Sequence, residues 1–197
     1  IPQFDAISLR EKSGKHVFTN FCWEYNDLEI VLDPTLLLNS GDYTKLLSYE
    51  EEEINAGIFY YVLDKNQYIS NVISDIQEII KKPAYGISNI QRDYKPLPSI
   101  EDWLTYIKNA SFVVTDSFHG MVFAIIFHKP FLVLKNGNRG ADRFLDMLSL
   151  LGLQDRVLSG DLTLNEILEK KIDWDSVNTK LGILREKSLK FLEYSLS

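Results

Sequence analysis

The stretch that decides the fold is VVTDSFHGMVFA, residues 113–124. It begins as an apolar strand, passes through a short polar turn, and runs straight into an apolar helix expected over residues 121–127. A buried strand followed at once by a helix is typical of α/β sheets, whose ligands bind beyond the carboxyl ends of the strands. This stretch therefore predicts both a parallel sheet and a binding site at its edge.

The same alternation of strand and helix extends over the rest of the chain. Several of its apolar strands are short and continuous, as expected for strands buried on both faces of a parallel sheet. We expect a Rossmann-like α/β fold, with helices on both faces of a mostly parallel sheet of about five or six strands. The expected strands lie at residues 5–9, 29–32, 57–62, 84–88, 112–115 and 131–134.

Amphipathic segments between these strands predict the helices. Five isoleucines and Val72 recur at helical spacing over residues 67–82, and Pro83 then ends that helix. Ser99 and Asp102 form the capping-box-like start of a helix that we expect to end at Asn109. Further helices are expected at residues 14–25 and 142–151. We also expect a single domain over residues 1–197, with a C-terminal helical segment, residues 159–197, packing back on it.

Composition excludes several classes of protein. The 197 residues include 21 Lys and Arg against 28 Asp and Glu, a net charge of −7, which argues against binding to nucleic acid or to an anionic membrane surface. Cys22 is the only cysteine, so a disulfide framework and a cysteine metal site are excluded, and a reducing, cytoplasmic location is expected. The longest apolar run, residues 121–134, is interrupted by His128, Lys129 and Pro130, so no membrane span is expected.

Motifs for metals and common cofactors are absent from the sequence. It contains no His-x-x-His, no paired cysteines and no glycine-rich dinucleotide fingerprint. We therefore expect neither a metal nor a cofactor.

The polar turn of the deciding stretch carries Ser117, His119 and Gly120. The start of a helix attracts anions, and glycine permits close approach to the backbone. Taken as chemistry alone, the turn fits a phosphate or carboxylate with a general acid beside it. It fits equally well a serine that caps the helix and a histidine that packs against a loop, and the residues leave both interpretations open.

Residues 98–134 closely resemble the C-terminal part of the polysaccharide pyruvyl transferase family. The core of the resemblance is Ser-Phe-His-Gly at residues 117–120, preceded by Val-Thr-Asp and followed by an apolar helix and a Lys-Pro pair at the start of the next strand. Three further segments resemble the family, and together they extend the similarity over residues 4–158. They are ISLREKSG at residues 7–14, VLDPTLLL at residues 31–38 and LGLQDRV at residues 151–157.

The resemblance implies a two-lobed, GT-B-like transferase of which this chain is the C-terminal lobe. Such enzymes transfer a pyruvyl group from phosphoenolpyruvate to two hydroxyls of a sugar in a cell-surface polysaccharide, forming a cyclic ketal and releasing phosphate. The partners implied are phosphoenolpyruvate and a saccharide acceptor, which can be lipid-linked, while the oligomeric state is not predicted. Because the active site of such an enzyme lies between the lobes, we expect the isolated chain to show little activity.

The resemblance also assigns roles to residues. His119 is the expected proton donor or phosphate ligand, since histidine titrates near neutral pH. Ser117 and Gly120 are expected to contact the substrate. Asp116 is expected to bond loop backbone rather than to act as a base.

Three arginines are expected to bind the substrate, because a guanidinium holds two oxygens of a carboxylate or phosphate at once. Arg10 directly follows a predicted strand, and Arg139 lies in the loop after another. Arg143 opens the next helix, where a cation opposes the helix dipole. Each could instead be an ordinary ion pair or a solvated charge.

Two other functions fit the same architecture. One is a GT-B-like glycosyltransferase lobe, in which the turn would hold the pyrophosphate of a sugar nucleotide; the other is a non-catalytic lobe or fragment. Phe59, Tyr60, Tyr61 and Phe123 are expected to be core residues rather than sugar platforms. Trp103 is expected to lie in the core or on the amphipathic face of its helix.

Overall fold

The computed structural model of the protein describes residues 6–20, 28–47, 56–88, 97–135, 141–158 and 162–197. Contacts between residues divide the chain into two compact units. Unit 1 consists of residues 1–38, 142–153 and 173–197, and unit 2 of residues 39–141 and 154–172. The single domain predicted over residues 1–197 stays a prediction.

Unit 2 is built on a five-stranded sheet in which every pair of neighbouring strands is parallel, in the order β4-β3-β5-β6-β7. The α/β, Rossmann-like fold predicted from the sequence is therefore confirmed. Crossovers between parallel strands need helices on the faces of the sheet, which explains the continuously apolar strands. The strands are β3 (Ile58–Val62), β4 (Ala84–Ser88), β5 (Phe112–Thr115), β6 (Phe131–Leu134) and β7 (Val157–Leu158).

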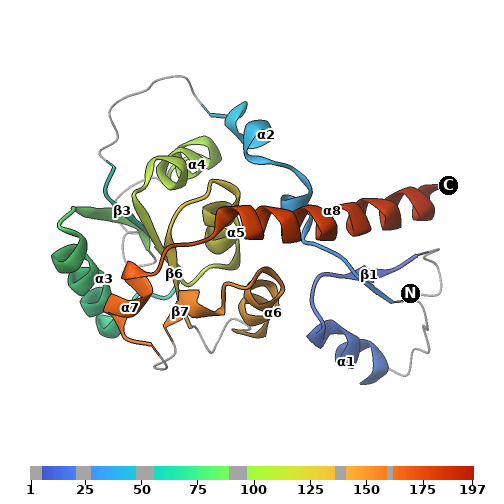
Figure 1. Ribbon diagram of the computed structural model, residues 1–197, viewed down its shortest axis with the longest axis horizontal. Coiled ribbons are helices and arrows are strands. Elements are labelled where there is room, and N and C mark those ends of the chain that lie inside the picture. The colour runs from blue at the N-terminus through green and yellow to red at the C-terminus, as the bar shows by residue number, and fades with distance from the viewer. Residues whose placement is uncertain (1–5, 21–27, 48–55, 89–96, 136–140, 159–161) are drawn as a thin grey trace. The chain divides into compact units, whose positions relative to one another are not determined.

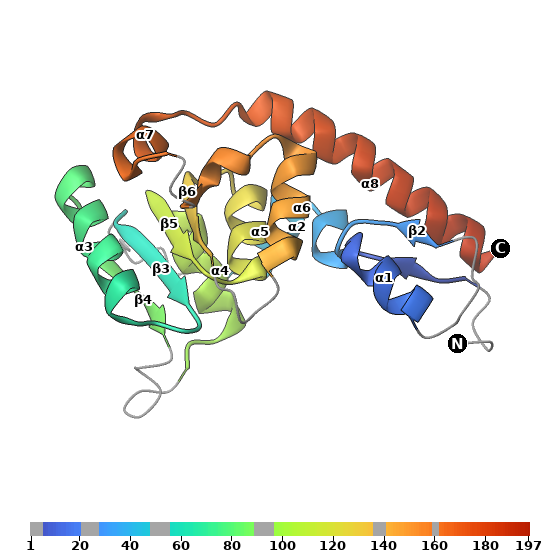
Figure 2. The same cartoon turned by 90° about the horizontal axis from the view of Figure 1, so that it is seen from below.

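Helices cover both faces of this sheet (Figures 1 and 2). On one face, α3 (Gln67–Ile80) and α7 (Leu164–Glu169) pack against alternate residues of the strands. The buried side chains of α3 lie at helical spacing, and each contributes about 1.5–3 kcal/mol when fully buried. The other face carries α4 (Ile100–Asn109) and α5 (Phe118–Ile126). The core on the α3 side contains Ile58, Val62, Ile73, Ile76, Val114, Leu132 and Ile167.

Side-chain caps set the start of the two helices on the second face. The Ser99 hydroxyl accepts from the Asp102 N–H, and the Asp102 carboxylate accepts from the Ser99 N–H, so the predicted capping box is confirmed. Ser117 is the N-cap of α5, which starts at Phe118 rather than at the predicted residue 121. The prediction was wrong by three residues because the helix was placed by its apolar run, whereas the Ser117 cap brings Phe118, His119 and Gly120 into the first turn.

Unit 1 contains a second, small sheet. Its strands β1 (Ser8–Leu9) and β2 (Glu29–Ile30) pair in parallel. The long helix α8 (Trp174–Leu196) runs along this sheet (Figure 2), and the Ser188 hydroxyl accepts from the Leu32 N–H at 2.9 Å. The other elements of this unit are α1 (Ser13–Asn20), the 3-10 turn η1 (Pro34–Leu37) and α6 (Ala141–Leu151).

The prediction that all six expected strands share one sheet was wrong for two of them. β1 and β2 pair with each other and not with the five-stranded sheet. The apolar run after residue 29 is short, and the N–H of Leu32 bonds to a helix side chain instead of to a neighbouring strand. The fifth strand of the main sheet is β7, which was not predicted because its two residues are too few to form a pattern.

A buried arginine anchors α7 to the sheet of unit 2. Arg156 ends the 3-10 turn η4 (Gln154–Arg156) and is 1% exposed. Its guanidinium donates to the Ile167 carbonyl at 3.0 Å and to the Lys170 carbonyl at 2.9 Å, and it pairs with the Asp155 carboxylate at 3.2 Å. A buried charge is tolerated only when its donors are satisfied, and these bonds meet that condition.

Candidate functional site

An open pocket of about 390 Å³ lies in unit 2, next to the carboxyl ends of three neighbouring strands. Tyr61 from β3 and Ile87 from β4 line it, as do Ser117 and His119 from the turn after β5. Its volume falls in the range of about 300–1,000 Å³ typical of sites for small molecules, and its position is that of ligand sites in open α/β sheets. The remaining lining residues are Leu97, Pro98, Ser99, Ile100, Trp103 and Phe123.

Two buried side chains fix the turn between β5 and α5. The Thr115 hydroxyl donates to the Tyr61 carbonyl at 2.6 Å and accepts from the Ser117 N–H at 3.0 Å. The Asp116 carboxylate accepts from the Leu63 N–H at 2.6 Å and from the Asp64 N–H at 3.0 Å. Asp116 thus bonds loop backbone, as predicted, and these contacts tie the end of β5 to the end of β3.

Ser117 lies at the N-cap of α5 and is 7% exposed, yet it lines the pocket. Its hydroxyl accepts from the Gly120 N–H at 3.5 Å, and its carbonyl accepts from the Met121 N–H at 3.1 Å. The N–H groups of Gly120 and Met121 therefore both have partners within the helix. The bond to Gly120 is long and weak, so a ligand oxygen could compete for that donor.

Gly120 is required by its surroundings. A Cβ at this position would lie 3.2 Å from Cδ1 of Tyr61 and would overlap the hydroxyl of Thr115. That hydroxyl is held by the Tyr61 carbonyl and cannot move aside without breaking its bond. Gly120 thus allows α5 to start directly against β5.

His119 is exposed and lines the pocket beside Ser117. Its ring contacts that of Phe118 edge-on, with centroids 5.5 Å apart. The imidazole does not lie in the core. Its position suits a group that exchanges a proton with a ligand in the pocket.

Aromatic rings form one wall of the pocket, and sequence reasoning missed them. Tyr61 is only half-buried, so the prediction that it is a core residue was wrong. Trp103, which was expected in the core or on the amphipathic face of its helix, is also half-buried. The Trp103 ring packs edge-on against Tyr61 at 5.2 Å and against Phe123 at 5.1 Å. Helical spacing placed Trp103 on the inward face of α4, but it could not show that this face opens onto a pocket. Phe59 and Tyr60 are buried in the core, as predicted.

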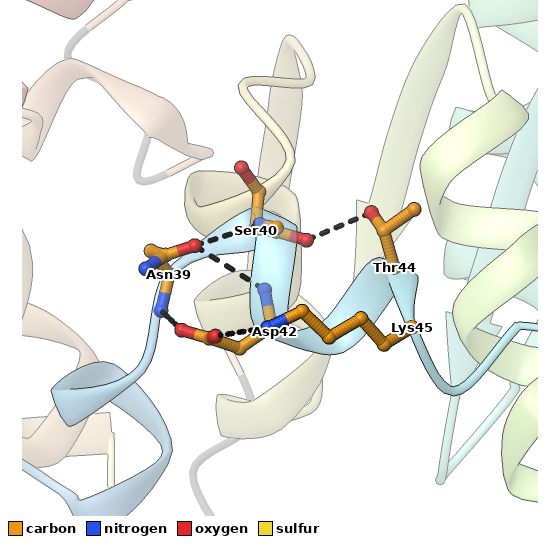
Figure 3. A network of polar contacts seen from close by, with 6 residues as sticks. Asn39, Ser40, Asp42, Thr44 and Lys45 are labelled. Carbon is orange, nitrogen blue, oxygen red and sulfur yellow. Dashed lines mark hydrogen bonds and ion pairs between the residues drawn. The ribbon is translucent and has the colours of Figure 1, made fainter.

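The short helix α2 (Ser40–Thr44) extends this row of rings. Tyr43 packs edge-on against Phe123, with centroids 4.9 Å apart. Asn39 caps the helix in a capping box with Asp42, and Lys45 bonds the Asp42 carboxylate at 3.1 Å (Figure 3). This cap fixes the turn that presents Tyr43.

The three predicted arginines are placed as follows. Arg10 belongs to unit 1, where its guanidinium donates to the Asp33 carboxylate at 2.9 Å and its side chain is 40% exposed. Arg143 lies in α6, but its side chain is outside the described part of the structure. Arg139 falls wholly outside the described residues. Their substrate-binding roles stay predictions.

The described residues contain no group of three or more His, Cys, Asp or Glu side chains that could hold a metal ion. Within the same part of the chain, no helix is long and apolar enough to cross a membrane.

Comparison with known families identifies the chain. A family model described as polysaccharide pyruvyl transferase matches residues 1–138. The chain belongs to the polysaccharide pyruvyl transferase family. No curated protein matches it. The range matched to the polysaccharide pyruvyl transferase family contains all the described residues that line the pocket, including Ser117 and His119.

Proposed function

We propose that the protein transfers a pyruvyl group from phosphoenolpyruvate to two hydroxyls of a saccharide, with the pocket of unit 2 at the reaction site. The observation that carries this proposal is the position of His119. It is exposed, it lies beside Ser117 at the carboxyl end of β5, and it lines a pocket of a size suited to small molecules. Membership of the polysaccharide pyruvyl transferase family supports the reaction class.

The reaction makes definite demands on the site. The CH2 carbon of phosphoenolpyruvate gains a proton to become a methyl group, and C2 becomes electron-poor. The first hydroxyl attacks C2 and loses its proton, and the C2–O bond to phosphate breaks. The second hydroxyl then attacks C2 and loses its proton, which closes the ketal. One hydroxyl proton balances the methyl group and the other leaves with hydrogen phosphate.

His119 is the proposed proton donor to the CH2 carbon. Donors aimed at developing charge stabilise a transition state, and a positioned acid typically contributes about 10²–10⁴-fold. Ser117 and the Gly120 N–H are proposed to contact the anionic groups of the donor, and Arg10, Arg139 and Arg143 to supply positive charge. Arg10 already bonds Asp33, but a guanidinium has five N–H donors, so that bond does not exclude a second acceptor.

Calorimetric titration of the full-length natural protein with phosphoenolpyruvate, and separately with UDP-glucose, tests the proposal. We expect phosphoenolpyruvate to bind, UDP-glucose not to bind, and His119→Ala to retain part of the donor affinity while losing phosphate release in the presence of saccharide. Preferential binding of UDP-glucose would favour a glycosyltransferase. Binding of neither would favour a non-catalytic protein.

A further inference from the structure

We infer that the aromatic wall of the pocket is a subsite for a neutral sugar ring, with Trp103 as its platform and a determinant of its specificity. This inference rests on the proposed function, because it assigns one part of the same pocket to the saccharide. It goes further in naming the residue that holds the ring and the charge class of ring that is accepted.

The wall has the form of a stacking surface. Tyr61 and Trp103 are half-buried and line the pocket, while Phe123 is 7% exposed and supports the Trp103 ring from beside it. Aromatic faces are negative, so the C–H groups on one face of a pyranose pack well against them. The Trp103 ring contacts both the Tyr61 ring and the Phe123 ring edge-on, so these neighbours hold it at the wall of the pocket.

The indole nitrogen gives a second, independent indication. Nε1 of Trp103 is buried and has no hydrogen-bond partner among the described residues. A buried donor without an acceptor is unfavourable, and phenylalanine would fill an apolar wall without that cost. A tryptophan at this position is explained by a ligand oxygen that accepts from Nε1 when a small rotation of the ring brings the N–H to the pocket.

Charge selects the kind of ring. None of the described residues that line the pocket is Lys or Arg. A carboxylate on the sugar would find no cation among the described residues of this wall, whereas a neutral ring needs none.

Binding of paired methyl glycosides to the full-length natural protein tests the inference. The probes are the methyl glycosides of glucose, galactose and mannose, each beside its uronic acid counterpart, measured by calorimetry and by saturation-transfer NMR. We expect at least one neutral glycoside to bind at least about tenfold more tightly than its uronic acid, with signal transfer to the C–H groups of one ring face. Trp103→Leu should abolish binding, and Trp103→Phe should weaken it by about fivefold, as for the loss of one neutral hydrogen bond.

Tyr106→Phe is the matched control, because Tyr106 lies on the same helix, packs against Phe59 and Tyr85, and is not among the lining residues. It should leave glycoside affinity unchanged. If Trp103→Leu does not fold, Trp103→Phe and the wild-type NMR pattern decide the matter. Uronic acids that bind as tightly as neutral glycosides, neutral glycosides that all fail to bind, or Trp103 variants with wild-type affinity would overturn the inference.

The same samples separate this inference from the proposed function. Phosphoenolpyruvate that binds and releases phosphate while no neutral glycoside binds would overturn the sugar subsite alone. A neutral glycoside that binds through Trp103 while phosphoenolpyruvate is neither bound nor consumed would overturn pyruvyl transfer and leave the sugar subsite standing.

Discussion

The turn after β5 and the Arg156 anchor lie at the same level of one sheet and use their polar groups differently. Strand register places Thr115 beside Val133 and Val133 beside Val157, so the two features are two strands apart. At the anchor, the guanidinium of Arg156 meets two carbonyls and one carboxylate and is 1% exposed. At the turn, Thr115 and Asp116 bond the backbone in the same way, but Ser117 and His119 face a pocket.

The difference separates residues that hold the fold from residues that can act on a ligand. Buried donors that already face protein oxygens stabilise structure, and removing them leaves unsatisfied groups behind. An exposed side chain on a pocket wall costs the fold little when it is changed. Arg156 should therefore affect stability without a direct part in chemistry, and His119 should affect chemistry with little effect on stability.

The largest expected effect is that of His119→Ala on turnover. Loss of a general acid should lower kcat for phosphate release from phosphoenolpyruvate by about 10²–10⁴-fold. Because His119 is exposed, the free energy of unfolding should change by less than about 1 kcal/mol. Steady-state kinetics and urea denaturation of the same variant measure both quantities. Wild-type turnover would show that His119 is not the proton donor and would remove the contrast with Arg156.

Arg156→Ala should produce the opposite pattern. It leaves the Ile167 and Lys170 carbonyls and the Asp155 carboxylate without their buried partner, which should cost about 3 kcal/mol of unfolding free energy. Lys170→Gln is the matched control, since it removes only an ammonium that is 62% exposed, and it should cost less than about 0.5 kcal/mol. Equal losses in the two variants, measured by urea denaturation, would show that the anchor does not depend on Arg156.

Two helix glycines extend the comparison to backbone packing. Gly120→Ala places a methyl group against the fixed hydroxyl of Thr115 and should destabilise by about 1–3 kcal/mol. Gly182 in α8 has open space around the position that a Cβ would take, with no atom within 4 Å, so Gly182→Ala should stabilise by about 0.5–1 kcal/mol through helix propensity. Thermal unfolding of both variants checks the signs. A stabilising Gly120→Ala would mean that the turn tolerates a side chain at the start of α5.

The smallest effect is the dependence of stability on pH at the anchor. Burial alone raises the pKa of Asp155, but hydrogen bonds and charge from Arg156 and Lys170 outweigh it, so its pKa lies below the ordinary value of 3.8. The ionised form is thus favoured by folding, and its contribution is fully present above about pH 4 and is lost as the pH falls through the folded pKa. The stability difference between wild type and Asp155→Asn, followed by urea midpoints, should narrow below that pH. If the difference in stability between the two proteins stayed constant down to pH 2, roughly two units below the pKa of an unfolded carboxyl group, this account of Asp155 would be contradicted.

Much of the fold could be predicted because its signals are local. The buried strands β3, β5 and β6 are continuous apolar runs. The capping-box residues Ser99 and Asp102 indicate the start of α4. The assignment of β1 and β2 to the main sheet was wrong because strand pairing depends on tertiary contacts. The Leu32 N–H, for example, donates to the Ser188 hydroxyl and not to a strand. The contacts of Arg156 could not be predicted for a similar reason. Two of its acceptors are backbone carbonyls, which every residue has, so no residue type in the sequence indicates them.

The candidate site was predicted only in part. Ser117 and His119 follow a buried strand, and their type and place indicated a site that the structure opens onto a pocket. Tyr61 was assigned to the core, and Trp103 to the core or to the amphipathic face of its helix, because an aromatic residue on an inward face is usually packed. That their rings are half-exposed on a pocket wall depends on the tertiary packing, which the spacing of residues in the sequence does not show.

The most direct test of the central claim is the fate of the phosphoenolpyruvate CH2 carbon when the full-length natural protein reacts with a saccharide in heavy water. We predict a ketal whose methyl group carries one deuterium from solvent, with one phosphate released for each ketal formed and with both signals lost in His119→Ala. A saccharide product without a labelled methyl group, or one formed from UDP-glucose while phosphoenolpyruvate is unchanged, would contradict that claim.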